Sequence, residues 1–234
     1  MAKFPQLQFH GGTTGVTGSC YELRVADDVG ILIDCGLFQG ADERPLEIDF
    51  PVDHIKALLV THVHIDHVGR IPYLLAAGFA GPIYCSEASA QLLPLVLEDA
   101  VKIGFTRNQR LVEGFLTLIK KRVVPVPFGQ WTDVAGTVAR VKFKRAGHIL
   151  GSAYIECDVV GRRFLFSGDL GAPYAPLLPA PRSPYRADTV VLESTYGDRL
   201  HSNRRRRREL LRQIIKRAFA DRGTILIPAF SIGR

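Results

Sequence analysis

The stretch LLVTHVHIDHVGR, residues 58–70, decides the fold of this chain because it joins an apolar strand to a dense group of possible metal ligands. Three of the chain's seven histidines fall here, and the group consists of His62, His64, Asp66 and His67. Residues i and i+2 of an extended chain point the same way, so His62 and His64 can face one ion. The turn that follows directs Asp66 and His67 toward a second position. Imidazole and carboxylate are usual zinc ligands, which favours a metal site over a histidine-rich surface loop.

Two further candidate ligands lie farther along the chain. His148 lies in RAGHILGSAY, residues 145–154, directly before a predicted strand. Asp169 ends an apolar strand in FLFSGDLG, residues 164–171. Taken alone, His148 is as readily a structural histidine, and Asp169 a turn or cap residue. Together with the first motif they fit a two-metal site that Asp169 bridges through its two carboxylate oxygens.

Short β-branched runs alternate with helical stretches, which predicts an α/β layered fold. The predicted strands cover residues 21–25, 30–36, 57–62, 82–86, 138–146, 153–160, 163–169, 189–195 and 224–230. The predicted helices cover residues 67–79, 88–104 with an interruption at Pro94, 107–121, and 207–223 with Gly223 as the stop. The proline-rich residues 171–188 are predicted to form an irregular connection.

The composition excludes several classes of protein. No run of about 18 apolar residues exists, so no membrane span is predicted, and the N-terminus does not resemble a secretory signal. The four cysteines form no C-x-x-C pair, which argues against a zinc ribbon and predicts reduced thiols in a cytoplasmic protein.

The net charge of +7 is consistent with a polyanionic partner, and much of the excess comes from one run of arginines. The run consists of Arg204, Arg205, Arg206, Arg207 and Arg208. It is either a phosphate-contacting edge or a solvated helix face, and five successive arginines on a helix cannot all face one groove.

The order H-x-H-x-D-H, then the G-H of residues 147–148, then the S-G-D of residues 167–169 resembles the metallo-β-lactamase superfamily. Asp34 in ILIDCG matches an aspartate that orients the metal loop in that superfamily. LESTYGDRLH, residues 192–201, and IPAFSIGR, residues 227–234, are similar to the β-CASP nuclease branch. With GVTGSCYEL at residues 15–23, the matches cover essentially the whole chain. The resemblance implies an αββα sandwich of two mixed sheets flanked by helices.

The resemblance also implies a ligand set and a reaction. His62, His64 and His148 hold one Zn²⁺, Asp66 and His67 hold a second, and Asp169 bridges the two. The two Zn²⁺ ions activate a hydroxide that hydrolyses phosphodiester bonds of single-stranded RNA, with DNA as the alternative substrate. Asp66 and Glu193 are the predicted catalytic residues. Glu193 matches a glutamate that supports a general-acid histidine; the alternative is a strand-end carboxylate paired with Arg199.

The family pattern places that histidine and a last zinc ligand beyond IPAFSIGR. We therefore expect a metallo-β-lactamase domain at residues 1–200 that is incomplete at its C-terminus, and the beginning of a β-CASP domain at residues 201–234. An open second zinc site and an unpaired sheet edge follow, and such an edge favours a homo-oligomer.

Two other functions stay open at this point. A small-ester or lactone hydrolase on the same fold explains the metal ligands but leaves ESTYGDRLH, residues 193–201, without a role. An inactive RNA-binding or scaffold relative is the non-enzymatic alternative. Loss of metal ligands usually marks such relatives, whereas the ligands expected within this chain are present.

Overall fold

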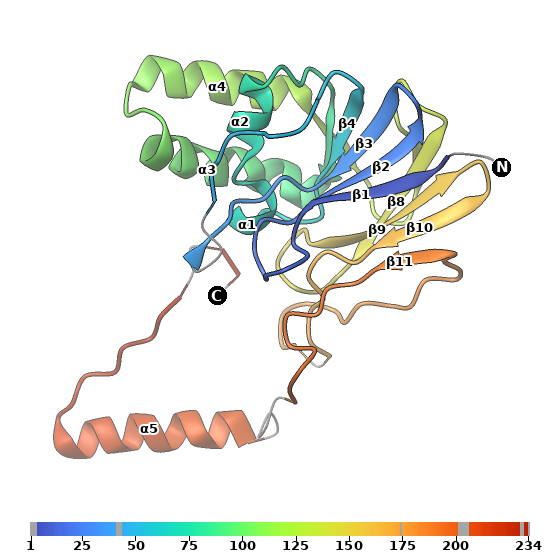
Figure 1. Ribbon diagram of the computed structural model, residues 1–234. Helices are drawn as coiled ribbons and strands as arrows, with labels where there is room; N and C mark the ends of the chain where they lie inside the picture. The colour runs from blue at the N-terminus through green and yellow to red at the C-terminus, as the bar shows by residue number, and fades with distance from the viewer. Residues whose placement is uncertain (1–3, 41–43, 174, 201–205, 230–231, 234) are drawn as a thin grey trace. The chain divides into compact units, whose positions relative to one another are not determined.

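The computed structural model describes residues 4–40, 44–173, 175–200, 206–229 and 232–233. It separates the chain into two compact units, Met1–Glu193 and Ser194–Arg234. The described part of the first unit holds two sheets and the helices α1 to α4, and that of the second holds the helix α5 (Figure 1). None of these helices combines the length and the apolar character needed to cross a bilayer. The domain boundary at residue 200 stays a prediction.

The first sheet has six strands in the order β1-β2-β3-β4-β5-β6. They are β1 (Gln6–Gly11), β2 (Cys20–Ala26), β3 (Val29–Ile33), β4 (Ile55–Leu59), β5 (Ile83–Ser86) and β6 (Val123–Val126). The β1–β2 and β2–β3 pairs are antiparallel, and the pairs from β3 to β6 are parallel. Parallel strands are covered on both faces, which explains the apolar runs at residues 31–33 of β3 and 57–59 of β4.

The second sheet has five strands in the order β11-β10-β9-β8-β7. They are β7 (Trp131–Asp133), β8 (Ala139–Arg145), β9 (Ala153–Val159), β10 (Arg162–Phe166) and β11 (Thr189–Val191). All pairs are antiparallel except β10–β11, which is parallel. Along β8, Val141 and Phe143 are buried while Arg140 is exposed, as the two-residue period of a strand requires.

The core lies between the two sheets. Leu23, Ile31 and Leu59 of the first sheet and Phe143 and Ile155 of the second belong to one buried cluster. Helices α1 (Ile65–Val68), α2 (Ile71–Ala76), α3 (Glu87–Gly104) and α4 (Gln109–Arg122) lie beside the first sheet (Figure 1). Helix α3 packs on β5 and β6, and α4 packs on α3. The predicted pair of mixed sheets with flanking helices is confirmed.

Some elements differ from the prediction. Helix α3 continues through Pro94, which is buried, because packing of the helix against β5 and β6 offsets the hydrogen bond that a proline removes. Residues 67–79 form the short helices α1 and α2 rather than one helix. Residues 224–229 form no strand, since the described part of their unit holds no strand that could pair with them.

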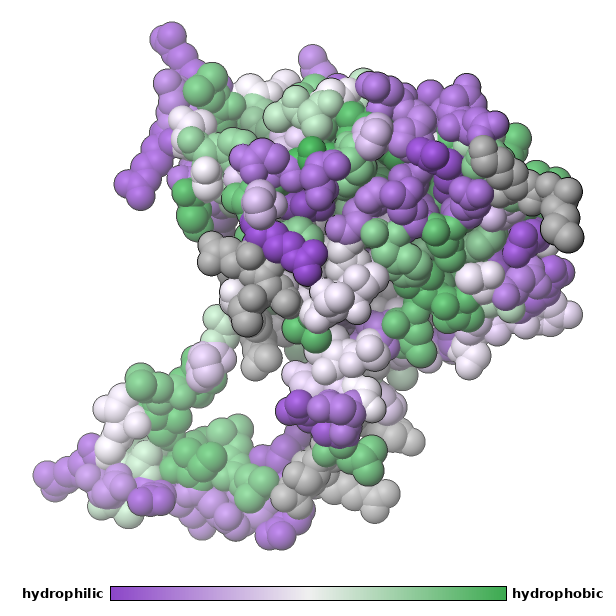
Figure 2. Space-filling view, viewed as in Figure 1, coloured by the Kyte–Doolittle hydropathy of each residue, from purple (hydrophilic) through white to green (hydrophobic). Residues whose placement is uncertain are grey.

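Helix α5 (Arg207–Asp221) keeps the predicted amphipathic pattern within its own unit. Figure 2 shows apolar atoms gathered along one side of this helix and hydrophilic atoms along the other. The helix ends where Arg222 adopts a left-handed conformation with φ of 51°, one residue before the predicted stop at Gly223.

Candidate metal centre

The loop that follows β4 is fixed to the ends of two neighbouring strands. The amide of Ser19 donates to the Asp66 carbonyl at 3.0 Å, and the amide of Cys35 donates to the His67 carbonyl at 2.8 Å. The amide of Val68 donates to the His64 carbonyl at 3.1 Å, which closes the single turn of α1. The backbone therefore holds the histidine motif in place at the rim of the first sheet.

Four of the predicted ligands form one compact group. The ligand atoms of His62, His64, His148 and Asp169 all lie within 4.8 Å of one another. The Nδ1 atom of His64 lies 3.2 Å from His62 Nε2 and 3.1 Å from His148 Nε2. The Oδ2 atom of Asp169 lies 3.5 Å from His148 Nε2 and 3.9 Å from His62 Nε2.

These spacings test whether the group can hold a metal ion. Two ligand atoms about 2.1 Å from a tetrahedral zinc ion lie roughly 3.4 Å from each other. The four measured separations, between 3.1 and 3.9 Å, bracket that value. The donor set of three imidazoles and one carboxylate fits a divalent metal ion, and together with the fold it supports a metal cofactor.

A second group shares Asp169 with the first. Its Oδ1 atom lies 3.3 Å from His67 Nε2, and that nitrogen lies 3.8 Å from Asp66 Oδ2. One oxygen of Asp169 thus faces the first group and the other faces the second. The structure brings all six predicted ligand residues together at one end of the sandwich.

Asp34 orients the His67 ring through a hydrogen bond to Nδ1, the ring nitrogen that does not face the other proposed ligands. Its Oδ2 atom accepts a hydrogen bond from His67 Nδ1 at 2.8 Å, so the ring is oriented with Nε2 toward Asp66 and Asp169. Asp34 is fully buried and has a left-handed backbone with φ of 58°, a conformation that costs about 1–2 kcal/mol for a residue other than glycine. A carboxylate held in this strained position is consistent with the orienting part predicted for Asp34.

Thr61 is a supporting residue that the sequence analysis missed. Its amide donates to Asp34 Oδ1 at 2.8 Å, and its hydroxyl donates to Asp34 Oδ2 at 2.7 Å. The hydroxyl oxygen also lies 3.1 Å from His62 Nδ1. There it can accept a hydrogen bond from the Nδ1–H group, which leaves Nε2 available to a metal. Its position next to His62 does not by itself distinguish Thr61 from an ordinary threonine at a strand end.

Glu193 supports the segment that carries Asp169. Its Oε1 atom accepts a hydrogen bond from the Leu170 amide at 3.1 Å, and its own amide donates to Ser167 Oγ at 2.9 Å. Arg199, the alternative partner considered for Glu193, pairs with Asp198 at 2.9 Å. A general-acid partner for Glu193 stays a prediction.

Burial and neighbouring charges shift the pKa values of His62, Asp169 and His67 in different directions. Burial, followed by the neighbouring imidazoles of His67, His148 and His64, holds the pKa of His62 well below its usual value. Burial opposes ionisation of Asp169, but hydrogen bonding to His67 and the charges of His67 and His148 lower its pKa. Burial opposes protonation of His67, but the charge of Asp34 and hydrogen bonds to Asp169 and Asp34 raise its pKa well above the usual value. A neutral imidazole and an ionised carboxylate are the forms that bind a metal, so metal binding at His67 would release a proton.

The loops that carry His148 and Asp169 touch each other through their backbones. The amide of Gly171 donates to the Ala146 carbonyl at 2.7 Å. A side chain on Gly171 would collide with the carbonyl of Gly147, and a side chain on Gly147 with the carbonyl of Pro179. The close approach therefore requires glycine at both positions.

The arginine run lies in the second unit. Arg206 precedes α5, and Arg207 and Arg208 form its first exposed positions. Arg204 and Arg205 lie outside the described residues. A part for the run in nucleic-acid binding stays a prediction.

Comparison with known proteins gives a family and several relatives. A model of the metallo-beta-lactamase superfamily matches residues 13–226. The chain is 36% identical over 229 residues to ribonuclease TTHA0252 from Thermus thermophilus, which covers 96% of this chain and 51% of that protein. It is 30% identical over 241 residues to transcription termination factor FttA from Methanocaldococcus jannaschii, with 98% and 38% covered. It is 32% identical over 213 residues to cleavage and polyadenylation specificity factor subunit 3-I from Arabidopsis thaliana, with 87% and 30% covered.

The chain spans about half the length of the first relative and a smaller share of the other two. These relatives are consistent with the β-CASP branch that the motifs predicted. Since the superfamily model covers most of the chain and the fold agrees with it, the chain belongs to the metallo-beta-lactamase superfamily.

Proposed function

We propose that this chain is a zinc-dependent ribonuclease that hydrolyses phosphodiester bonds in single-stranded RNA. The observation that carries the proposal is the shared group of histidines and aspartates, in which Asp169 faces two sets of ligands with its two oxygens. The names of the relatives, a ribonuclease and a cleavage factor subunit among them, support RNA as the substrate rather than DNA.

Two zinc sites are proposed. His62, His64 and His148 hold the first ion, Asp66 and His67 hold the second, and Asp169 contacts both. Zinc held by these residues would lower the pKa of a water molecule and so supply a nucleophile at neutral pH.

The remaining side chains prepare the site. Asp34 and Thr61 fix the rings of His67 and His62 so that each directs its Nε2 atom into the site. Glu193 holds the backbone of Leu170 and so fixes the segment that carries Asp169. Asp66 and Glu193 are proposed as catalytic residues. The Asp66 carboxylate lies beside His67, and the Glu193 carboxylate holds the backbone next to Asp169.

A cytoplasmic location stays a prediction. The buried free thiols of Cys20, Cys35, Cys85 and Cys157 agree with a reducing compartment.

The first experiment measures cleavage of a labelled single-stranded RNA by the purified chain with zinc. The parent protein is compared with His64→Ala, which removes a ligand, and with Asp133→Asn, which changes an exposed carboxylate outside the centre. We expect cleavage by the parent and by Asp133→Asn, and loss of cleavage in His64→Ala and after chelation. The zinc content of each protein is measured in parallel. A parent that binds zinc at these ligands and leaves the RNA intact would contradict the proposal for this chain.

A further inference from the structure

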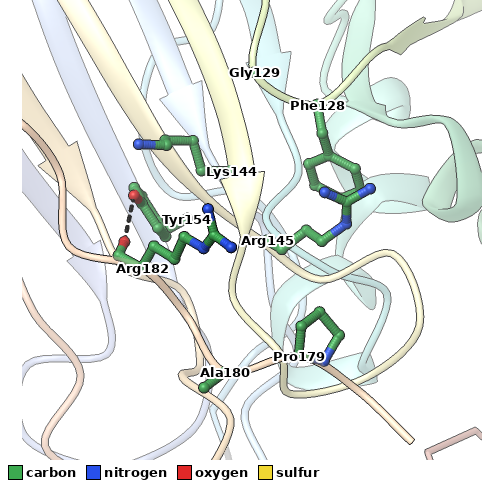
Figure 3. Close-up of a pocket in the computed structure, with 8 residues that line it drawn as sticks. All are labelled: Phe128, Gly129, Lys144, Arg145, Tyr154, Pro179, Ala180 and Arg182. Atoms are coloured by element: carbon green, nitrogen blue, oxygen red, sulfur yellow. Dashed lines mark hydrogen bonds between the residues drawn. The ribbon is translucent and has the colours of Figure 1, made fainter.

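A pocket of about 350 Å³ opens beside the metal loops, on the outer face of the second sheet. Its walls include Phe128, Lys144 and Arg145, the ring of Tyr154, and Pro179 and Arg182 of the proline-rich connection (Figure 3). Among the described residues that line it, three are cationic and none is acidic. The electrostatic character of the pocket therefore favours an anion.

The cations of the pocket differ in how far they are neutralised. Lys144 Nζ lies 3.6 Å from Glu156 Oε1, and Lys142 also approaches that carboxylate, at 3.5 Å from Oε2. Lys144 therefore shares a partner, whereas Arg145 and Arg182 are exposed at the mouth of the pocket. These two guanidinium groups supply most of the positive charge that a ligand would meet.

The walls are held in place by specific contacts. The Tyr154 hydroxyl donates to the carbonyl of Arg182 at 2.7 Å, which ties the proline-rich connection to β9 (Figure 3). The Arg145 guanidinium carbon lies 4.8 Å from the centre of the Phe128 ring. A guanidinium supported on a ring is positioned to bind a phosphate through two hydrogen bonds or to stack on a base.

The pocket adjoins the metal centre along the chain. Arg145 precedes His148 by three residues, which places their Cα atoms at most about 11 Å apart. The carbonyl of Pro179 lies against Gly147, the neighbour of His148 in the same loop. A strand held at the metal centre can therefore reach the pocket with a nearby nucleotide.

We propose that this pocket binds a nucleotide of the RNA strand, with Arg182 and the Arg145 guanidinium that covers the Phe128 ring on a backbone phosphate. The proposal rests on the proposed function, since it assigns a second contact to the same strand. It makes the pocket an RNA-positioning site outside the metal centre. The charge and the aromatic surface of the pocket are those that single-stranded nucleic acid uses.

The test measures binding of a labelled single-stranded RNA by fluorescence anisotropy across a range of salt concentrations. Chelator is present throughout, so cleavage does not contribute. The proteins are the parent, Arg145→Gln, Arg182→Gln and the control Arg110→Gln, which removes an exposed arginine of α4. Circular dichroism checks that all four are folded.

We expect the two pocket variants to bind several-fold more weakly than the parent, and the control to bind as the parent does. The slope of log affinity against log salt should fall by about 0.7 for each phosphate contact that is lost. Equal binding by the pocket variants and by Arg110→Gln would overturn the pocket proposal, and so would a parent that does not bind RNA.

The two proposals fail in different ways. A parent that cleaves RNA while the pocket variants bind like the control overturns the pocket and leaves the ribonuclease. A parent that does not cleave, with pocket variants that bind more weakly than the control, overturns the ribonuclease and leaves the pocket as an RNA-binding site.

Discussion

At the residue scale, Asp34 shows how one buried side chain serves the metal site without touching a metal. It accepts hydrogen bonds from His67 and from Thr61, and its backbone is held in a left-handed conformation to do so. Outer partners of this kind typically change metal affinity 10- to 100-fold. Asp34 is therefore a sharper probe of the proposed centre than a ligand is, because the ligands themselves remain.

Asp34→Asn should weaken zinc binding by about 10- to 100-fold, since an amide does not stabilise the His67 ring as a carboxylate does. Zinc affinity is measured by competition with a coloured chelator. Asp133→Asn, at an exposed position of β7, is the control and should bind zinc as the parent does. Unchanged affinity in Asp34→Asn would show that Asp34 serves the loop backbone alone.

Sequence patterns singled out the six residues that the structure brings together, but not the side chains that hold them in place. His62, His64, Asp66 and His67 carry a spacing that a single local motif reveals, and His148 and Asp169 lie next to glycines at strand ends. Thr61 carries no such signal, because a threonine at a strand end is ordinary. Its importance arises when the chain folds and brings Asp34 against it.

At the element scale, a polar cluster ties β1 and β2 to the segment before β4. The Glu22 carboxylate is almost fully buried and lies 3.0 Å from His10, 2.8 Å from His54 and 3.0 Å from Arg24. Burial opposes ionisation of Glu22, but the hydrogen bonds from His10, His54 and Arg24 outweigh it and lower its pKa to about 2. The carboxylate therefore links three segments while it stays charged.

Lowering the pH should protonate the Glu22 carboxylate and so remove the stability that its ionised form contributes. Because the folded pKa of about 2 lies below the ordinary glutamate value of 4.5, ionised Glu22 stabilises the fold above pH 4.5, and that contribution is lost as the pH falls toward 2. The shift corresponds to about 3 kcal/mol of unfolding free energy. Urea unfolding of the parent and Glu22→Gln across this range should show the difference between them shrinking as the pH falls. Glu113→Gln, on exposed α4, should show no such trend; a pH-independent gap for Glu22→Gln would contradict the assignment.

The elements that the sequence did not reveal have physical explanations. Strand β1 alternates polar and apolar residues only over Gln6–His10, with just two apolar positions, which is too short a stretch to establish the period. Strand β6 contains Pro125, which is tolerated because β6 is an edge strand of the first sheet. Strand β7 has three residues, too few for a period to show. The long apolar runs, by contrast, were predictable because burial on both faces requires them.

At the scale of the whole molecule, the proposed ligands come from both sheets. His62 to His67 follow β4 of the first sheet, while His148 lies between β8 and β9 of the second and Asp169 follows β10. A metal ion held by this set connects the two sheets at one end of the core. Binding to the folded state alone should therefore stabilise the first unit as a whole.

Zinc should raise the thermal midpoint of the parent. At a free zinc concentration about 100 times the dissociation constant, binding adds about 2.7 kcal/mol, or roughly 5–10 °C for a chain of this size. Thermal unfolding followed by circular dichroism, with zinc and with chelator, measures the shift. His64→Ala should show a smaller one. An equal shift in both proteins would place the stabilising zinc elsewhere.

The contact between the Gly147 and Gly171 loops has a consequence for how this family can diverge. A change at His148 or Asp169 removes chemistry and leaves room in the fold, whereas any side chain at either glycine collides with a neighbouring backbone. Selection on catalysis and selection on foldability thus act on adjacent positions. In a relative that has lost the proposed activity, the histidine and the aspartate are free to change, and the two glycines should be retained because the fold still requires them.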